Sequence, residues 1–421
     1  MVEKISRVFA RQVLDSRGNP TVECEVHTSS GFSRAMVPSG ASTGVHEALE
    51  LRDNDHCFLG KSVTMAVTNV NTAIAKALVG LDVTDQRVVD NALLALDGTP
   101  NKSRLGANAI LSASMAACRE SARVQGIPLH EFIGFLAAND RFVLPCPASN
   151  LINGGAHAGN ELDIQEFMVM PLGAKSFAEG IQIVAEIYQT LKKKIVAKYG
   201  KQAVNVGDEG GFAPPLKEVR EPIELILSAV QELGYSDVVR LALDSAASGF
   251  YADEAYTLAG KRLSGPELME VYFDLKKTYD VYSFEDPFAE DDWLNWSDFT
   301  AEVGNVAQVV GDDLLVSNPV RIRKALMEEA CNALLLKVNQ IGTVSEALEA
   351  ASLARKNGWK VMVSHRSGET EDSFIADLAV GLGCGQIKSG APCRSERTAK
   401  YNQLLRIEEG LEARGQTNYF K

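Results

Sequence analysis

Several apolar runs in the second half of this sequence end in a charged side chain. The clearest run, residues 333–336, is an alanine followed by three leucines, and Lys337 comes directly after it. Such a run is typical of a strand that is buried on both faces. An ammonium group is costly to bury and loses its proton readily when desolvated, so Lys337 is a candidate base. A single strand-end lysine more often reaches solvent, and the interpretation therefore depends on the neighbouring runs.

Three neighbouring runs end in carboxylates, which are Asp244, Glu285 and Asp312. Carboxylates on successive strands form a hard oxygen site that suits a magnesium ion. Aspartate also caps helices and forms turns, which would explain any one of these residues but not their repeated placement. We therefore predict a metal site here, and a bound cation would favour the neutral form of Lys337.

Two further runs end in groups that could hold an anion. Residues 361–363 are followed by His365, Arg366 and Ser367 after one serine, and residues 386–387 are followed by Lys388. Guanidinium, hydroxyl and ammonium groups bind phosphate or carboxylate. These residues are candidates for substrate binding.

Glycine-rich loops supply more candidates. Residues 153–160 contain His157 and are followed by Glu166, and residues 206–211 place Glu209 among glycines, where backbone can approach a ligand closely. A lone histidine is more often structural than catalytic. The loop 38–47 is rich in small and hydroxyl residues; it could ligate a metal or phosphate, or be an ordinary surface loop.

Short apolar runs alternate with amphipathic helices from residue 148 onward, which predicts an α/β fold with a parallel sheet. Eight such units would close a barrel with its active site at the carboxyl ends of the strands. The sequence offers nine candidates, so one is not a barrel strand: 148–152, 165–170, 203–206, 239–243, 281–284, 307–310, 334–336, 360–363 and 386–387.

The first part of the chain has a different pattern. It predicts an antiparallel sheet followed by helices, with strands at 5–14, 21–28 and 33–37 and helices at 63–81, 86–96 and 107–125. The segment 140–147, which contains Pro145 and Pro147, follows the last helix, and we place the domain boundary just before this segment. The expected domains are residues 1–139 and 140–421.

Composition limits the possible functions. The chain has 421 residues, is 46% hydrophobic and 23% charged, and carries a formal net charge of −13. No basic tract stands out, which argues against nucleic-acid binding, although an anionic small substrate remains compatible with local cations. The seven cysteines are widely spaced and include no Cys-x-x-Cys, as is typical of reduced thiols in the cytoplasm. We also expect no membrane span and no secretory signal.

Nine runs, in order along the chain, resemble the enolase family: 15–21, 38–50, 153–168, 207–214, 283–293, 311–319, 334–342, 364–377 and 388–397. The resemblance covers essentially the whole sequence. It implies a small α+β N-terminal domain and a C-terminal (β/α)8-type barrel whose first two strands are antiparallel, with residues 204–211 as a catalytic loop instead of a strand. The implied reaction is the reversible dehydration of 2-phosphoglycerate to phosphoenolpyruvate, a hydro-lyase step of glycolysis.

The resemblance also implies roles for the candidate residues. A lysine or histidine base with one or two magnesium ions is a known property of this superfamily and not an inference from these residues. Two magnesium ions are implied here, the first on Asp244, Glu285 and Asp312 and the second on Ser42 when its loop closes. Lys337 would remove the C2 proton. The remaining implied roles are Glu209 as the acid for the C3 hydroxyl, Glu166 and His157 beside it, Arg366 and Ser367 on the phosphate, Lys388 on the carboxylate, and His365 lining the pocket.

Other functions remain open at this point. A different lyase of the same superfamily would use the same metals, although the Ser42 loop and residues 365–367 argue against it. The family also implies a homodimer, in some members an octamer, and a second location at the cell surface or outside the cell without a signal peptide. There a C-terminal lysine such as Lys421 can bind plasminogen. The sequence departs from the family pattern after Asp244 and at Cys393, neither of which touches a proposed ligand.

Overall fold

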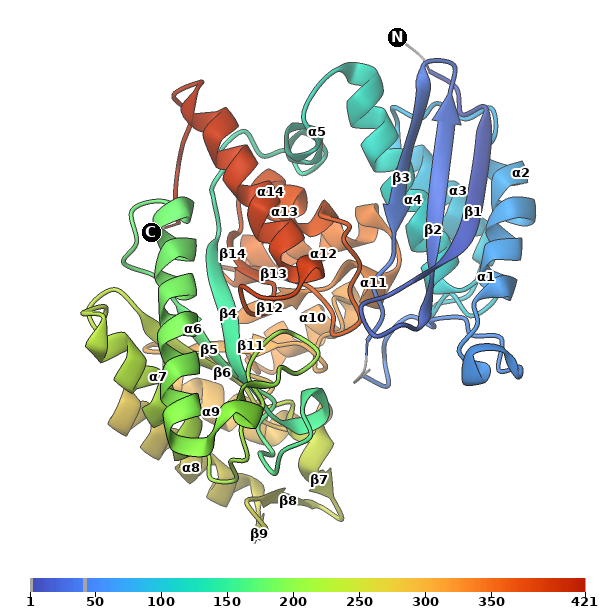
Figure 1. The fold of residues 1–421 in the computed structure, drawn as a ribbon. Helices are drawn as coiled ribbons and strands as arrows, with labels where there is room; N and C mark the ends of the chain where they lie inside the picture. The colour runs from blue at the N-terminus through green and yellow to red at the C-terminus, as the bar shows by residue number, and fades with distance from the viewer. Residues whose placement is uncertain (1–2, 41–43, 421) are drawn as a thin grey trace.

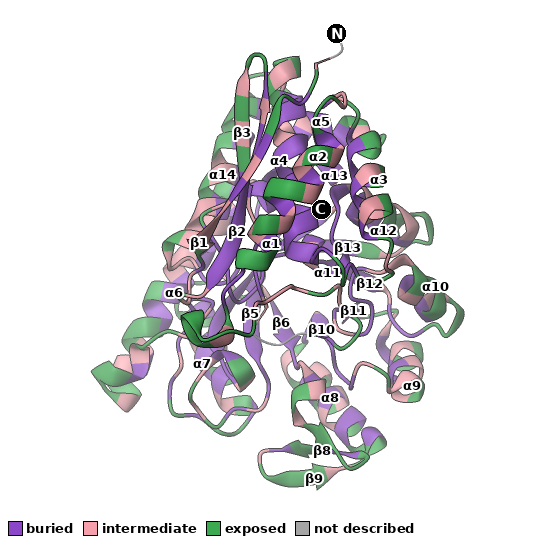
Figure 2. Ribbon diagram, turned by 90° about the vertical axis from the view of Figure 1, so that its right-hand side faces the viewer, coloured by how far each residue is buried: buried purple, intermediate pink, exposed green. Residues whose placement is uncertain are grey.

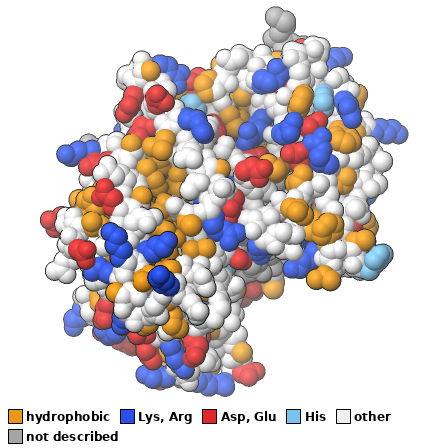
Figure 3. All heavy atoms as spheres, viewed as in Figure 1, with side chains coloured by type: hydrophobic (Ala, Val, Ile, Leu, Met, Phe, Trp, Pro, Cys, Tyr) orange, Lys and Arg blue, Asp and Glu red, His pale blue; other side chains and the backbone are white. Residues whose placement is uncertain are grey.

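The computed structural model describes residues 3–40 and 44–420. Figure 1 shows a smaller N-terminal part, built on three long strands, beside a barrel formed by the rest of the chain. Charged side chains of both signs are interspersed over the face shown in Figure 3. No helix of the described part has the length and apolar character needed to cross a bilayer.

The N-terminal part is an antiparallel sheet covered by helices. Its strands pair in the order β1 (Arg7–Leu14), β2 (Pro20–Thr28) and β3 (Gly31–Met36). The small side chains of α4 (Ala107–Gln125) let this helix pack directly on β2 and β3. The remaining helices are α1 (Thr64–Asn69), α2 (Ala75–Leu78), α3 (Gln86–Asp97) and α5 (Leu129–Leu136). Strands and helices therefore form where the sequence predicted them.

Eight strands close the barrel. They are β4 (Cys146–Asn153), β5 (Glu166–Met170), β6 (Arg240–Asp244), β10 (Ser283–Glu285), β11 (Gln308–Gly311), β12 (Ala333–Leu336), β13 (Lys360–Ser364) and β14 (Gly385–Lys388). The strand β5 runs antiparallel to both of its neighbours, and the other pairs are parallel. This confirms a barrel whose first two strands are antiparallel.

The barrel strands are almost completely buried. All four residues of β12 are buried, as expected for a strand covered on both faces, and Figure 2 shows buried residues concentrated along the strands. Outside lie α6 (Phe177–Tyr199), α7 (Arg220–Glu232), α8 (Gly265–Tyr279), α9 (Trp293–Val303), α10 (Pro319–Met327), α11 (Val338–Ile341), α12 (Val344–Lys356), α13 (Phe374–Leu382) and α14 (Ser395–Glu412). A small antiparallel sheet follows β6, made of β7 (Tyr251–Ala252), β8 (Ala255–Leu258) and β9 (Lys261–Leu263).

The ninth apolar run, residues 203–206, is not a barrel strand. Lys201–Val204 forms a short 3-10 helix, and a loop follows it. Phe212, at the end of this loop, donates its backbone N–H to the carbonyl of Leu151 at 2.9 Å and so fastens the loop to β4. The loop therefore carries Glu209 to the rim of the barrel, as the family resemblance implied.

Aromatic side chains are unevenly distributed. All three tryptophans and all ten tyrosines lie beyond residue 139. Between the barrel and its helices, the rings of Tyr272, Phe284, Phe288 and Phe299 lie 5.4 to 6.0 Å apart, mostly edge to face. Such pairs add specific attraction to the burial of apolar area. Trp296 is fully buried close by.

Candidate active site

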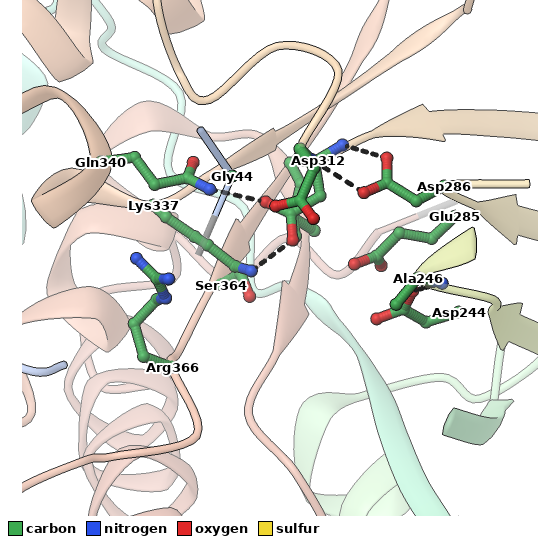
Figure 4. Close-up of polar contacts among 12 residues, drawn as sticks. Gly44, Asp244, Ala246, Glu285, Asp286, Asp312, Lys337, Gln340, Ser364 and Arg366 are labelled. Carbon is green, nitrogen blue, oxygen red and sulfur yellow. Dashed lines mark hydrogen bonds and ion pairs between the residues drawn. The ribbon is translucent and has the colours of Figure 1, made fainter. Parts of the chain in front are cut away.

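The charged residues predicted from the sequence meet at one end of the barrel. Asp244 ends β6 and Glu285 ends β10, whereas Asp312 and Lys337 come directly after β11 and β12. Lys388 ends β14. Parallel strands present their carboxyl ends on the same side, which explains the convergence visible in Figure 4.

Two lysines lie among the carboxylates. The Nζ atom of Lys388 is 2.8 Å from Asp244 Oδ2, 2.7 Å from Glu285 Oε1 and 3.2 Å from Glu166 Oε2. The Nζ atom of Lys337 is in close contact with Asp312 Oδ2. Lys388 and the four carboxyl groups are buried, and Lys337 is largely so, with its side chain 13% exposed. Each of the four carboxyl groups therefore lies next to an ammonium group.

This pairing determines the pKa of Lys337. Burial lowers the pKa of its ammonium group, but the nearby carboxylates, above all Asp312 and then Glu285, together leave the pKa raised. The pKa of Asp312 is lowered, because Lys337 outweighs the effect of burial on the carboxylate. Beside Asp312, Lys337 is thus held as a cation, whereas the sequence analysis expected its neutral form to be favoured next to a bound metal ion. It can become neutral only when Asp312 is engaged elsewhere, as it would be by a metal ion.

The donor set fits a hard divalent cation. Asp244, Glu285 and Asp312 offer carboxylate oxygens, the ligands that magnesium prefers. Glu285 Oε2 is buried without a hydrogen-bond partner among the described residues, which is unusual for a carboxylate. Burial raises the pKa of Glu285 well above its ordinary value, and Asp244 raises it further. A cation would relieve both costs. Ser42, the implied ligand of a second ion, lies outside the described residues.

Asp286 was not singled out by sequence reasoning, although it adjoins Glu285. Its two carboxylate oxygens accept the backbone N–H groups of Asp312 at 2.9 Å and Asp313 at 2.8 Å. Asp286 therefore fixes the backbone of Asp312 and so helps to orient its side chain. Together with Asp312 and Asp313 it forms one of the two groups, within the described ranges, whose potential ligand atoms lie within 4.8 Å of one another.

The second group is His157, Glu166 and Glu209. His157 Nδ1 is 3.6 Å from Glu166 Oε1 and 3.6 Å from Glu209 Oε1. Burial raises the pKa of Glu166 well above its usual range, and the charge of Glu209 adds to this. The pKa of Glu209 is lowered, because His365 and His157 outweigh burial. The pair therefore favours a proton on Glu166 over one on Glu209.

His365 is a neutral imidazole. Burial lowers its pKa to about 3. Its Nδ1 is 2.7 Å from Arg397 Nη1, and its Nε2 faces Glu209 Oε1 at 3.3 Å. His365 therefore connects the loop after β13 to the loop that carries Glu209.

Arg366 is held by a residue from the N-terminal part. Its Nη1 and Nη2 donate to the two carboxylate oxygens of Glu47 at 2.9 and 3.0 Å, and Nη1 also donates to Asn339 Oδ1 at 3.0 Å. Ser367 is buried next to it. Sequence reasoning did not identify the contact between Glu47 and Arg366, although Glu47 lies in the run 38–50. Both parts of the chain thus build this side of the site.

These side chains surround a single small cavity of about 10 Å³, which has room for about one water-sized sphere. The structure therefore brings all the predicted site residues within the described ranges to one place, and the cavity is lined by His157, Gln165, Glu166, Glu209, Asp244, Lys337, Ser364, His365, Arg366, Ser367 and Lys388. Carboxyl groups and a lysine that line one cavity can add and remove protons on neighbouring atoms of a small molecule.

Comparison with known families accounts for both parts of the chain. Residues 141–420 match the family described as enolase, C-terminal TIM barrel domain, and residues 5–133 match enolase, N-terminal domain. The chain belongs to the enolase family. Among curated relatives, the enolase of Thermococcus gammatolerans is 58% identical over 413 residues, which covers 97% of this chain and 95% of that protein. The enolase of Thermococcus kodakarensis is 57% identical over the same shares. Membership of the enolase family implies the use of a divalent metal.

Proposed function

We propose that this chain catalyses the reversible dehydration of 2-phosphoglycerate to phosphoenolpyruvate and water. Enolase-family similarity along nearly the whole chain supports this reaction. The observation that carries the proposal is that Lys337, paired with Asp312, lines the same small cavity as Glu166, Glu209 and His157. A 2,3-elimination needs a base and an acid arranged in this way.

Lys337 is the proposed base for the C2 proton. A proton next to a carboxylate is barely acidic until positive charge stabilises the electrons left behind. Two magnesium ions, the first on Asp244, Glu285 and Asp312 and the second on Ser42, would supply that charge when bound. The contact of Lys337 with Asp312 supports this assignment, since a metal ion bound to Asp312 would weaken the attraction that holds the lysine as a cation.

Glu209 is the proposed acid for the departing C3 hydroxyl. Its lowered pKa means that it must receive a proton before it can give one. Glu166 holds that proton, and His157 Nδ1 lies 3.6 Å from a carboxylate oxygen of each residue. We propose that these three residues share the proton.

The remaining groups bind the substrate. Arg366 and Ser367 would take the phosphate, and Lys388 the carboxylate, since guanidinium and ammonium groups suit these anions. His365 lines the pocket beside Glu209. No specific observation favours another lyase of the superfamily, and turnover of a non-phosphorylated hydroxy acid with none of 2-phosphoglycerate would reopen that alternative.

The test is phosphoenolpyruvate formation from 2-phosphoglycerate, followed by absorbance, with magnesium or with a chelator. The natural chain should turn over only with the metal. Lys337→Ala should reduce kcat by about 10²–10⁴-fold, the usual contribution of a general base. Lys356→Ala removes an exposed lysine at the end of α12 and should have no effect. Persistent turnover in Lys337→Ala would remove its role as base, and no turnover by the folded natural chain would overturn the reaction.

We further propose a homodimer, as in the family, with an octamer as the larger alternative, and light scattering on the purified protein tests this.

All seven cysteines are free thiols, which supports the cytoplasm as the location. A surface role in plasminogen binding would rest on Lys421, which lies outside the described residues. Loss of plasminogen binding on removal of residues 419–421 is the result expected for that role.

A further inference from the structure

Arg397 is a fully buried cation next to the site. It lies in the first turn of α14, its side chain is 0% exposed, and it is not among the residues that line the cavity. Its Nη2 donates to the carbonyl oxygens of Ser367 at 2.6 Å and Asp208 at 2.9 Å, and its Nη1 donates to the carbonyl of Arg366. A single guanidinium therefore joins the loop that carries Glu209 to the loop that carries the proposed phosphate ligands.

The same guanidinium constrains an imidazole. Arg397 Nη1 is 2.7 Å from His365 Nδ1. Guanidinium nitrogens only donate hydrogen bonds, so this contact requires an unprotonated Nδ1. A neutral imidazole must then carry its proton on Nε2. That atom lies 3.3 Å from Glu209 Oε1.

Stability alone does not account for this arrangement. Buried arginines are normally compensated by carboxylates. A carboxylate oxygen of Glu396 lies 3.6 Å from Arg397 Nε, which is too far for a hydrogen bond. Nε has no hydrogen-bond partner in the described part of the chain. The guanidinium instead donates hydrogen bonds to three backbone carbonyls and one imidazole, all of which belong to loops at the site.

Close packing keeps these groups in place. A Cβ atom at Gly390 would lie 2.5 Å from the carbonyl oxygen of Glu209, 3.1 Å from Arg397 Cδ and 3.2 Å from His365 Cε1. Ala391 N–H donates to the same Glu209 carbonyl at 2.9 Å. The backbone carbonyl of Glu209 and the side chains of Arg397 and His365 therefore all pack against Gly390, in the loop after β14, where an added Cβ atom has no room.

We propose that Arg397 is a positioning residue, which fixes His365 as the Nε2–H tautomer facing Glu209 and holds the Glu209 loop against residues 366–367. Its kinetic consequence rests on the function proposed above, whereas the tautomer does not. The lowering of the His365 pKa by burial supports a neutral ring through the physiological range.

Nitrogen-15 NMR of histidine-labelled natural chain tests the tautomer directly. The sequence has six histidines, and His365→Gln identifies the signal of interest. The expected pattern is a protonated Nε2 and an unprotonated Nδ1 between about pH 6 and 8. A protonated Nδ1, in either the neutral ring or the imidazolium, would overturn the proposal. This measurement needs no variant of Arg397 and does not depend on turnover.

Arg397→Lys tests the consequence, because a single ammonium cannot serve four acceptors in fixed directions. We expect mixed tautomers at His365 and a loss of about 10²-fold in kcat/KM, as for small displacements of catalytic groups. Arg394→Lys is the matched control on the same helical turn, since Arg394 contacts Glu396 and Ser16 and not His365, and should change kcat/KM by less than about threefold.

Two outcomes of the variant contradict the proposal. The first is natural activity with a pure Nε2–H tautomer, and the second is lost activity with that tautomer intact, which would make Arg397 merely structural. If the natural chain has the expected tautomer but no turnover of 2-phosphoglycerate, the proposed reaction fails and the placement of His365 stands.

Discussion

Lys388 is the residue whose charge has most influence on the site. Its ammonium group touches Asp244, Glu285 and Glu166, and it is 2% exposed. The Coulomb attraction in such a cluster offsets the cost of removing its charges from water only while all partners are present. We therefore propose two roles for Lys388. It binds the carboxylate of the substrate, and it compensates the negative charge of the proposed metal ligands Asp244 and Glu285.

Lys388→Met tests this compensation. Removing one partner of a buried charge cluster leaves uncompensated carboxylates, which typically costs about 3–5 kcal/mol. We expect a loss of this size in the free energy of unfolding, measured with urea in the presence of a chelator. Magnesium should restore part of it, because a divalent cation supplies the missing charge. Lys360→Met, at the exposed start of β13, is the control. Equal stability of the two variants would contradict the compensation.

His365 predicts a pH dependence of stability. Its pKa is lowered to about 3 in the folded chain, from an ordinary value near 6.5. The unfolded chain thus takes up the proton first, so this contribution is complete above about pH 6.5 and is lost as the pH falls toward 3. Between pH 7.5 and 5.5, we expect the natural chain to lose about 1 kcal/mol more in free energy of unfolding than His365→Gln. Parallel urea-unfolding results for the two chains would contradict this.

At the scale of elements, apolar periodicity predicted most of the fold. The helix expected at 107–125 forms with those bounds, and the leucine run forms β12. The helix expected at 63–81 contains a wide π-helical turn at Val70–Ile74, which apolar spacing cannot reveal because the buried side of the helix is continuous. The sheet β7–β9 was not anticipated, since its strands are only two to four residues long.

The site was predictable only in part, for a related reason. Residues at strand ends could be found because the barrel brings strand ends together. The groups that orient them could not, because their contacts span large sequence separations: Glu47 and Arg366 are 319 residues apart. The role of Arg397 could not be predicted either, although the residue ends the run 388–397. A basic residue in the first turn of a helix has no distinctive sequence pattern.

The loop after β14 offers a test at this scale. Gly390 has a φ of 74°, and an added Cβ atom would meet the carbonyl of Glu209. Gly358 has a φ of 79°, but nothing lies within 4 Å of its added Cβ. Gly358→Ala should therefore cost only the left-handed backbone, about 1–2 kcal/mol, with normal turnover. Gly390→Ala should be less stable and lose turnover, because it displaces Glu209. Equal effects on thermal midpoint and kcat would show that only backbone strain matters.

At the scale of the whole molecule, both parts of the chain meet at the site. Glu47 pairs with Arg366, Val45 N–H donates to Glu290 at 3.0 Å, and His46 lies 3.0 Å from Asp291. We propose that the two domains are residues 1–139 and 140–421. The family matches to residues 5–133 and 141–420 are compatible with this division.

Metal binding should stabilise the whole molecule. A ligand that binds only the folded chain adds RT ln(1 + [L]/Kd), about 2.7 kcal/mol at a hundredfold excess over Kd. The thermal midpoint should therefore rise with magnesium concentration and fall on chelation. Asp244→Asn should remove most of the rise, whereas Asp298→Asn, which is exposed on α9, should keep it. A rise that is the same in both variants would place the ion elsewhere.

The uneven distribution of aromatic residues makes the two parts optically distinct. Because every tryptophan and tyrosine lies beyond residue 139, emission excited near 280 nm reports on the barrel alone. Far-ultraviolet ellipticity, by contrast, reports on the helices of both parts. A lag between the two signals during unfolding would therefore time the separation of the N-terminal part from the barrel without any attached dye. Coincident traces would mean that the two parts open together.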